Sequence, residues 1–182
     1  MKLNKPKFWD KKNSVLSIIL FPISLIVIFL IFIKKKTTRT QRFKIPIICV
    51  GNIYIGGTGK TPTSLYLANA LKQMSKNPAI LKKHYKNQND EHNLIKEHFK
   101  NLIICRDRVE GIKQAGINRF DSIILDDGFQ DYRIQADLNI LCFNQNQLIG
   151  NGLVLPAGPL RENLSSLKNA NIIIINGKKN LE

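Results

Sequence analysis

The sequence predicts an α/β fold, in which a P-loop NTPase-like parallel sheet is flanked by helices and preceded by an N-terminal apolar membrane helix. From residue 45 onward, apolar runs suited to buried strands alternate with helical patterns. A glycine-rich turn separates the first such run from the first helical pattern. An uncharged apolar run, residues 15–33, precedes both. We therefore expect an N-terminal anchor over residues 1–44 and a P-loop domain over residues 45–182.

The glycine-rich turn has the layout of a phosphate-binding loop. It follows the apolar run 45–50 and leads into a helical pattern from Lys60 to about Ser75. Glycines let successive backbone N–H groups point at one anion, and the helix N-terminus adds partial positive charge. We expect Lys60 to reach the terminal phosphates of a nucleoside triphosphate and Thr61 to coordinate Mg²⁺. The expected nucleotide-binding residues are Tyr54, Ile55, Gly56, Gly57, Thr58, Gly59, Lys60 and Thr61.

One position of this loop departs from the usual pattern. The first residue of the motif is ordinarily glycine and is Tyr54 here. A strand-to-helix turn that binds no nucleotide is therefore the alternative. The position of Gly-Lys-Thr, at the start of a helix and directly after an apolar strand, favours the nucleotide site.

The remaining elements follow from hydrophobic periodicity. Residues 82–89 show neither a helical nor a strand period and are expected to form a loop. Residues 150–162 are too rich in glycine and proline for regular structure. Strands are expected at 79–81, 102–105, 120–125, 138–143 and 170–175, and helices at 90–100 and 108–115. In a parallel sheet of this kind, ligands bind at the carboxyl ends of the strands.

Two acidic positions are candidates for catalysis or metal binding. Asp126 and Asp127 end an apolar strand, where carboxylates beside a phosphate loop suit Mg²⁺ or its waters. The expected metal residues are thus Thr61, Asp126 and Asp127, with a solvated strand end as the alternative. Asp90 opens a helical pattern, and helix capping explains it equally well from these residues alone.

The apolar run 15–33 is expected to enter a membrane. As a helix it is about 28 Å long, close to the ~30 Å hydrocarbon core. Its length and the lysines at 34–36 disfavour a cleaved signal peptide. A cytoplasmic nucleotide site would place the lysines before residue 15 outside if the helix crossed, against the positive-inside tendency. Pro22 also allows a segment that dips in and returns. The sequence leaves spanning and monotopic insertion open.

The net charge indicates which binding partners to expect, and the cysteine spacing indicates which compartment. The net charge is +15, and much of the excess flanks the apolar run, which suits anionic phospholipid headgroups. No nucleic-acid-binding module is recognisable, so no nucleic-acid partner is expected. Cys49, Cys105 and Cys142 are widely spaced, which argues against a disulfide framework and against a zinc site. We expect the three cysteines to be buried free thiols of a protein in a reducing compartment.

Several short strings occur together in this chain: Phe-Trp at 8–9, Val-Gly-Asn at 50–52, Gly-Gly-Thr-Gly-Lys-Thr-Pro at 56–62, Arg-Asp-Arg at 106–108, Asp-Asp-Gly-Phe-Gln at 126–130, Gly-Asn-Gly at 150–152 and Leu-Pro-Ala-Gly-Pro-Leu-Arg-Glu at 155–162. With these strings the chain resembles the tetraacyldisaccharide 4'-kinases, the lipid A 4'-kinases of Gram-negative bacteria. The resemblance extends over nearly the whole sequence. The family's loop also lacks the first glycine.

The resemblance implies transfer of the ATP γ-phosphate, with Mg²⁺, to the 4'-hydroxyl of a tetraacyl glucosamine disaccharide 1-phosphate. It assigns Asp90 to the sugar hydroxyl proton, Asp126 and Asp127 to Mg²⁺ and phosphate, and Arg161 and Glu162 to the cleft. Asp90 and Asp127 are therefore the expected catalytic residues. The expected partners are the lipid-linked substrate and inner-membrane phospholipid, with no obligate protein partner. The catalytic domain is expected on the cytoplasmic face of the inner membrane.

Three departures from the family pattern are visible. Residues 82–86 keep only Tyr85 of the family's Ser-Arg-Gly-Tyr-Gly, and Asp131 replaces a histidine. The family's smaller C-terminal lobe, which carries a histidine partner for the catalytic aspartate, is expected to be absent from residues 45–182. Two alternatives follow: a non-catalytic membrane-tethered remnant, and a membrane-associated P-loop ATPase.

Overall fold

A computed structural model describes residues 5–85 and 89–178, with the side chains of 89–91 left undescribed. The described strands are β1 (Ile47–Gly51), β2 (Pro78–Lys83), β3 (Leu102–Cys105), β4 (Ser122–Asp126), β5 (Leu138–Asn144) and β6 (Ile172–Asn176). The α-helices are α1 (Val15–Thr37), α2 (Lys60–Gln73), α3 (Asn89–His98) and α4 (Arg108–Ile117), and the 3-10 helices are η1 (Lys7–Asp10) and η2 (Leu164–Asn169). The strands form one sheet in the order β3-β2-β4-β1-β5-β6, and every pairing in it is parallel.

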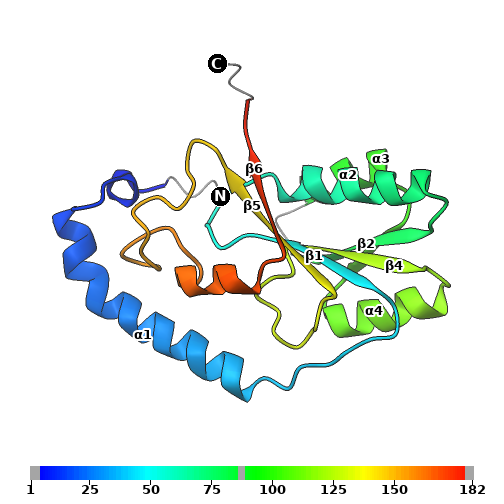
Figure 1. Ribbon diagram of the computed structural model, residues 1–182, viewed down its shortest axis with the longest axis horizontal. Helices are drawn as coiled ribbons and strands as arrows, with labels where there is room; N and C mark the ends of the chain where they lie inside the picture. Colours follow the sequence, from blue (N-terminus) through cyan, green and yellow to red (C-terminus); the bar gives the residue numbers. More distant parts are fainter. Residues whose placement is uncertain (1–4, 86–88, 179–182) are drawn as a thin grey trace.

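Helices cover both faces of this sheet, with α2 and α3 on one side and α4 on the other (Figure 1). Neighbouring residues of a strand point to opposite faces, so Val50 packs with the α2 and α3 side and Cys49 with the α4 side. Ala68 of α2 and Ile112 of α4 are buried in these two separate clusters. Burial on both faces is the reason that the strands read as nearly continuous apolar runs. The predicted α/β class is confirmed.

The strand order brings two loops together at one edge of the sheet. β1 lies between β4 and β5, and the chain passes over β4 on its way from β1 to β2. Val50 pairs with Asp126 across β1 and β4, so the start of the glycine-rich loop lies beside the end of β4. Such a switch in strand order opens a crevice at the carboxyl ends of the strands.

One predicted loop is partly a strand. Lys82 and Lys83 continue β2, and Lys82 pairs in register with Asp126 and Ile104. The two lysines interrupt the apolar pattern, and for this reason the sequence predicted a loop. The strand nevertheless includes Lys82, because its ammonium contacts the Asp126 carboxylate at 2.6 Å. Residues 86–88 of the same predicted loop lie outside the described residues.

The apolar N-terminal helix α1 lies against the rest of the domain along one narrow face. Ser24 donates to the carbonyl of Val154 at 2.8 Å and accepts from the backbone N–H of Ala157 at 3.0 Å. Near its start, Ser17 accepts from the Asn151 side-chain amide at 3.1 Å. The residues at least partly buried on this helix follow one helical stripe: Ser17, Leu20, Ser24, Val27, Ile28, Ile31 and Lys35.

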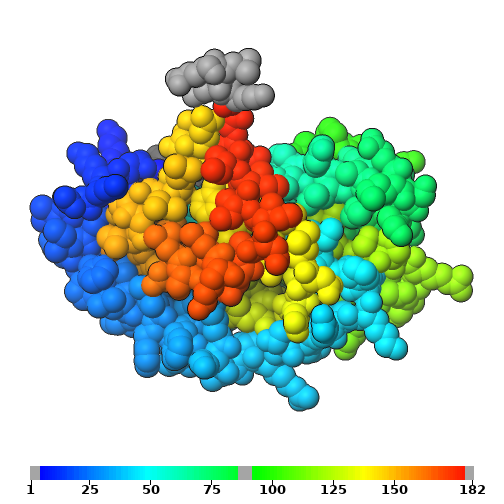
Figure 2. Space-filling model, in the orientation of Figure 1, coloured from blue at the N-terminus to red at the C-terminus, as the bar shows by residue number. Residues whose placement is uncertain are grey.

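The other faces of α1 are apolar and exposed. Its exposed large hydrophobic residues are Val15, Leu16, Ile18, Ile19, Phe21, Ile23, Leu25, Ile26, Phe29, Leu30, Phe32 and Ile33. Figure 2 shows this helix, in blue, along the flank of the molecule and beside the orange segment that follows β5. By length and composition it is long and apolar enough to cross a membrane. An exposed apolar surface of this extent marks an interaction surface.

Candidate functional site

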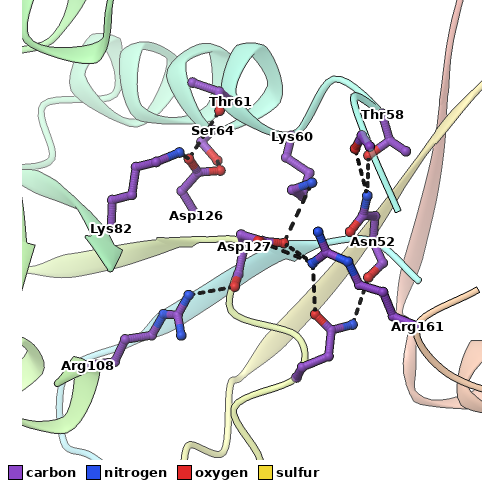
Figure 3. A network of polar contacts seen from close by, with 12 residues as sticks. Asn52, Thr58, Lys60, Thr61, Ser64, Lys82, Arg108, Asp126, Asp127 and Arg161 are labelled. Carbon is purple, nitrogen blue, oxygen red and sulfur yellow. Dashed lines mark hydrogen bonds and ion pairs between the residues drawn. The ribbon is translucent and has the colours of Figure 1, made fainter. Parts of the chain in front are cut away.

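The glycine-rich loop between β1 and α2 is held by side-chain amides. Gly56 and Gly59 have positive φ angles of 119° and 83°, which glycine adopts without strain. The buried Thr58 hydroxyl accepts from the Asn52 amide at 2.9 Å, and the Thr58 carbonyl accepts from Asn176 of β6 at 2.8 Å. Figure 3 shows Asn52 directed at Thr58. The loop is therefore held in shape by the protein's own hydrogen bonds.

This loop borders a cavity of about 720 Å³. Its lining includes Gly56–Pro62 of the loop and of the first turn of α2. The other lining residues are Lys82, Tyr85, Leu94, Asp126, Asp127 and Arg161. Because the N-terminus of α2 opens into a cavity that contains Lys60, the site suits the phosphates of a nucleotide.

The first two residues of the expected nucleotide-binding set, Tyr54 and Ile55, make contacts away from this cavity. The Tyr54 side chain is buried in a core cluster with Leu141 and Phe143, and its backbone forms an antiparallel bridge with Leu160. The Ile55 N–H donates to the Pro159 carbonyl at 2.9 Å. Neither residue lines the cavity. The chain is still strand-like at Tyr54, so no glycine is required there, and the turn begins at Gly56.

Asp126, at the end of β4, is fully buried and accepts from three directions. Its carboxylate contacts Lys82 Nζ at 2.6 Å, the Thr61 hydroxyl at 3.2 Å and the Ser64 hydroxyl at 3.3 Å. A buried carboxylate is tolerated only when it is paired and hydrogen-bonded. These contacts tie the first turns of α2 to β2 and β4 (Figure 3).

Asp127 faces the cavity with strained backbone geometry. Its φ of 59° is uncommon for a residue with a side chain, although Asp tolerates it better than most. Its carboxylate lies 3.6 Å from Lys60 Nζ and 3.1 Å from Arg161 Nη1, and Arg108 donates to its carbonyl at 2.7 Å. Burial raises the pKa of Asp127, but the charges of Lys60 and Arg161 outweigh it, so the pKa lies below its usual value.

Thr61, Asp126 and Asp127 supply oxygen atoms of the kind that magnesium prefers, and Lys82 Nζ contacts the same Asp126 oxygen as Thr61, at 2.6 Å. Mg²⁺ is usually held by one or two carboxylates together with substrate phosphates and waters. The Thr61 hydroxyl and the Asp126 carboxylate are adjacent, and the Asp127 side chain is 23% exposed to the same cavity. These are the three residues that the sequence predicted as metal ligands, and the structure brings them together.

A second cavity, of about 930 Å³, adjoins the first. The two cavities share Tyr85, Asp127 and Arg161 in their linings. The remaining residues of the second cavity are Lys34, Thr38, Arg39, Gln41, Lys83, Asp107, Arg108, Gln130, Asp131, Tyr132 and Arg133. Its wall thus includes the end of α1 and the segment after it, and most of its charged side chains are basic.

Asp131 organises the arginines of this second cavity. Its two carboxylate oxygens accept from Arg133 Nε and Nη2 at 2.8 and 2.9 Å, and Arg108 Nη1 lies 3.6 Å away. Arg133 also donates to Asp107 at 2.6 Å. Burial raises the pKa of Asp131, but the hydrogen bonds and charge of Arg133 outweigh it and hold the pKa below its usual value. The residue that replaces the family's histidine is therefore an anchor for two arginines.

Asp131→Asn is expected to lower the free energy of unfolding by about 1–2 kcal/mol at pH 7, because two charge-assisted hydrogen bonds weaken. A carboxylate with a depressed folded-state pKa stabilises the fold above its unfolded pKa, about 3.9, and loses this contribution as pH falls through the folded value. Thermal melting from pH 7 to pH 3 should show the difference from wild type shrinking below about pH 4. The exposed Glu110→Gln is the control. A difference unchanged at pH 3 would contradict the assignment.

The structure places the remaining predicted residue, Asp90, in the first turn of α3, with its side chain outside the described set. Leu94, one turn further along α3, lines the first cavity. Sequence reasoning missed the site role of Lys82 and left that of Arg161 unassigned. A lysine that interrupts an apolar strand beside the phosphate loop was the available signal for Lys82, whereas the role of Arg161 depends on long-range contacts.

A parallel sheet, a glycine-rich loop opening a helix after β1, and a buried aspartate at the end of the adjacent β4 define a P-loop nucleotide-binding protein. Comparison with known families narrows this class. Residues 16–182 match the family described as tetraacyldisaccharide-1-phosphate 4'-kinase, and the chain belongs to that family.

Individual relatives agree with the family match. A tetraacyldisaccharide 4'-kinase of Pelagibacter ubique is 44% identical over 98% of this chain and 57% of its own length. One from Coxiella burnetii is 33% identical over 94% of this chain and 60% of its own length. A crystal structure of LpxK from Aquifex aeolicus in complex with ATP superposes with a TM-score of 0.76 at 29% identity, covering 89% of this chain and 59% of that one. The chain thus spans less than two thirds of the length of these relatives.

Proposed function

We propose that this chain provides the nucleotide site and part of the acceptor site of a lipid A 4'-kinase. The reaction would transfer the γ-phosphate of ATP to the 4'-hydroxyl of a tetraacyl glucosamine disaccharide 1-phosphate. The observation that carries the proposal is the meeting of two cavities, one at the phosphate loop and one lined by basic residues, at Asp127 and Arg161. The name of the Pelagibacter ubique relative and the ATP bound to the Aquifex aeolicus structure support it.

In this proposal the first cavity binds ATP. The loop from Gly56 to Gly59 and the N-terminus of α2 surround the phosphates, and Lys60 leaves Asp127 to contact them. Thr61, Asp126 and Asp127 would hold Mg²⁺, which neutralises charge on the transferring phosphoryl group. Arg161 stands at the border of both cavities, where a second cation can stabilise charge on the same group.

The second cavity is proposed to receive the sugar headgroup of the acceptor. Lys34, Arg39 and Lys83 line it, and their charges suit an anionic sugar phosphate. Lys34 and Arg39 lie at and just beyond the end of α1, so a headgroup bound here would extend from the membrane-associated side of the molecule. An anionic lipid substrate therefore matches both the charge and the location of this cavity.

In the transfer step, the bond between the acceptor 4'-oxygen and the γ-phosphorus forms while the bond from that phosphorus to the β–γ bridging oxygen breaks. ADP leaves with the electron pair of the broken bond. The hydroxyl proton passes to the carboxylate of Asp90, the role that the family resemblance assigns to it. Asp90 lies in the first turn of α3, the helix whose Leu94 lines the ATP cavity.

We also propose that α1 is monotopic, on the cytoplasmic face of the inner membrane. Its docked stripe runs from Ser17 to Lys35, about 27 Å of helix, and hydrogen bonds to residues 151–162 occur at both ends and in the middle. A helix crossing the bilayer would carry these polar loop residues into hydrocarbon, where unsatisfied backbone groups are costly. Lying in the interface, it can bury its exposed apolar faces in one leaflet instead.

The proposed function is tested by incubating the detergent-solubilised chain with Mg²⁺, ATP and tetraacyl disaccharide 1-phosphate. We expect a lipid product one phosphate heavier, with the new group on the 4'-oxygen by NMR. The same lipid already phosphorylated at that position is the control acceptor and should gain nothing. ATP binding without any lipid product would contradict the kinase proposal and favour a non-catalytic remnant.

A further inference from the structure

Glu162, next to Arg161 in the chain, is a buried carboxylate whose cation comes from the membrane-associated helix. The residue is fully buried, and its Oε2 lies 2.5 Å from Lys35 Nζ. Ser166 donates to the same oxygen at 2.7 Å, and Lys35 also donates to the Ser166 hydroxyl at 3.1 Å. The Lys35 ammonium lies 5.0 Å from the centre of the Tyr132 ring. A buried carboxylate of this kind depends strongly on its paired cation.

Arg161 is fixed to the phosphate site by its backbone and by its side chain. Its N–H donates to the carbonyl of Ile53, just before the glycine-rich loop, at 2.7 Å. Its guanidinium donates to Asp127 at 3.1 Å and approaches the Gln130 side-chain oxygen at 3.5 Å. Figure 3 shows Arg161 directed at Asp127, which in turn faces Lys60. A shift of this backbone therefore moves a cation shared by both cavities.

We propose that Lys35 is a positioning residue that holds Arg161 in the phosphate site through Glu162. The docking of α1 on the domain is thereby coupled to the position of Arg161 in that site. The loop before Glu162 is also bound to α1, through Ser24 at Val154 and Ala157. When α1 is docked, residues 161–162 are held from two sides. Arg161 is hydrogen-bonded to Ile53, just before the glycine-rich loop, and Glu162 is paired with Lys35. This inference rests on the proposed binding of ATP in the first cavity, but not on transfer of its phosphate to a lipid.

Loss of the Lys35 charge has a specific expected effect. The Glu162 carboxylate would remain buried without its cation and would move toward water or toward another cation. Either movement displaces the adjoining Arg161 from Asp127 and from the ATP phosphates. Lys36 offers a matched comparison, because it is exposed and its ammonium lies 6.0 Å from the Phe32 ring on the same helix.

The test measures Mg²⁺-ATP affinity by calorimetry on the detergent-solubilised full chain. We expect Lys35→Met to weaken binding about tenfold and Lys36→Met to change it less than twofold. Lys35→Arg should keep wild-type affinity, because it retains the charge. In Lys35→Met/Glu162→Gln, which removes both charges, affinity should recover to within about threefold of wild type. With Arg161→Gln already present, Lys35→Met should add less than a twofold loss.

Two results would overturn the proposal. The first is wild-type affinity in Lys35→Met. The second is a tenfold loss from Lys35→Met that persists in the Arg161→Gln background, because it would show that Lys35 does not act through Arg161. If Lys35→Met alone fails to fold, Lys35→Gln takes its place, because its amide is polar but carries no charge to pair with Glu162. The same tenfold loss is expected of Lys35→Gln, and wild-type affinity in that variant would overturn the proposal. All of these readouts are ATP affinities, so they stand apart from the product assay that tests the kinase reaction.

Discussion

Lys60→Ala is expected to weaken ATP binding about 30-fold or more. Lys60 is the cation at the start of α2 in the phosphate-loop cavity, and hydrogen bonds from a charged donor contribute about 1.5–3 kcal/mol each. The substitution also removes one of the two cations that face Asp127, which leaves that carboxylate to repel the incoming phosphates. Calorimetric titration of the solubilised chain with Mg²⁺-ATP measures the effect.

Lys72→Ala is the matched control, since Lys72 is exposed in the last turn of the same helix and its substitution removes an equal charge. The affinity of this variant for ATP should stay within twofold of wild type. Equal losses in the two variants would mean that general charge, and not the loop, governs nucleotide binding. Unchanged affinity in Lys60→Ala would refute the phosphate-loop assignment.

Asp127→Asn is expected to slow phosphoryl transfer about 100-fold or more while leaving ATP affinity unchanged or tighter. The substitution removes a carboxylate from between Lys60 and Arg161, which frees both cations for the phosphates. It also removes one proposed Mg²⁺ ligand and disturbs the geometry of transfer. Asparagine tolerates the positive φ of this position, so the backbone should persist. Single-turnover rates and ATP affinity are measured on the same preparation.

Asp127→Gly separates the charge from the backbone at this position. Glycine adopts a φ of 59° freely, so this variant also lacks the carboxylate without strain. We expect the same pattern of slow transfer with retained ATP binding. A parallel loss of ATP affinity and transfer rate in both variants would show that Asp127 supports the fold of the loop and has no separate role in transfer.

Local patterns were sufficient to predict the fold and the nucleotide side of the site. Strands buried on both faces read as apolar runs, and Gly-Lys-Thr at a helix start has few other uses. The pairing of Val50 with Asp126 then brings two predicted motifs together, because parallel strands end at the same edge of the sheet. For this reason the amino-acid sequence alone is enough to group Thr61 with Asp126.

Long-range contacts decided the features that the sequence did not reveal. The Tyr54 side chain points into the core because the Tyr54 backbone pairs with Leu160, and a local motif does not reveal this contact. The Lys82 ammonium is accommodated at the end of a buried strand because it reaches Asp126, which comes much later in the chain. The docked face of α1 is marked in sequence only by Ser17 and Ser24 within an apolar run, and apolar composition indicates a membrane without showing which side meets protein.

The fate of the γ-phosphate tests the proposed function most directly. The solubilised chain is loaded with ATP labelled in the γ-phosphate, and the label is followed in a single turnover with and without tetraacyl disaccharide 1-phosphate. We predict that the label appears on the 4'-oxygen of the lipid, that little of it is released as inorganic phosphate when the acceptor is absent, and that Asp127→Asn slows its transfer about 100-fold or more. Label released as inorganic phosphate regardless of acceptor would indicate an ATPase, and label that stays in bound ATP would indicate a non-catalytic protein; either result would contradict the kinase assignment.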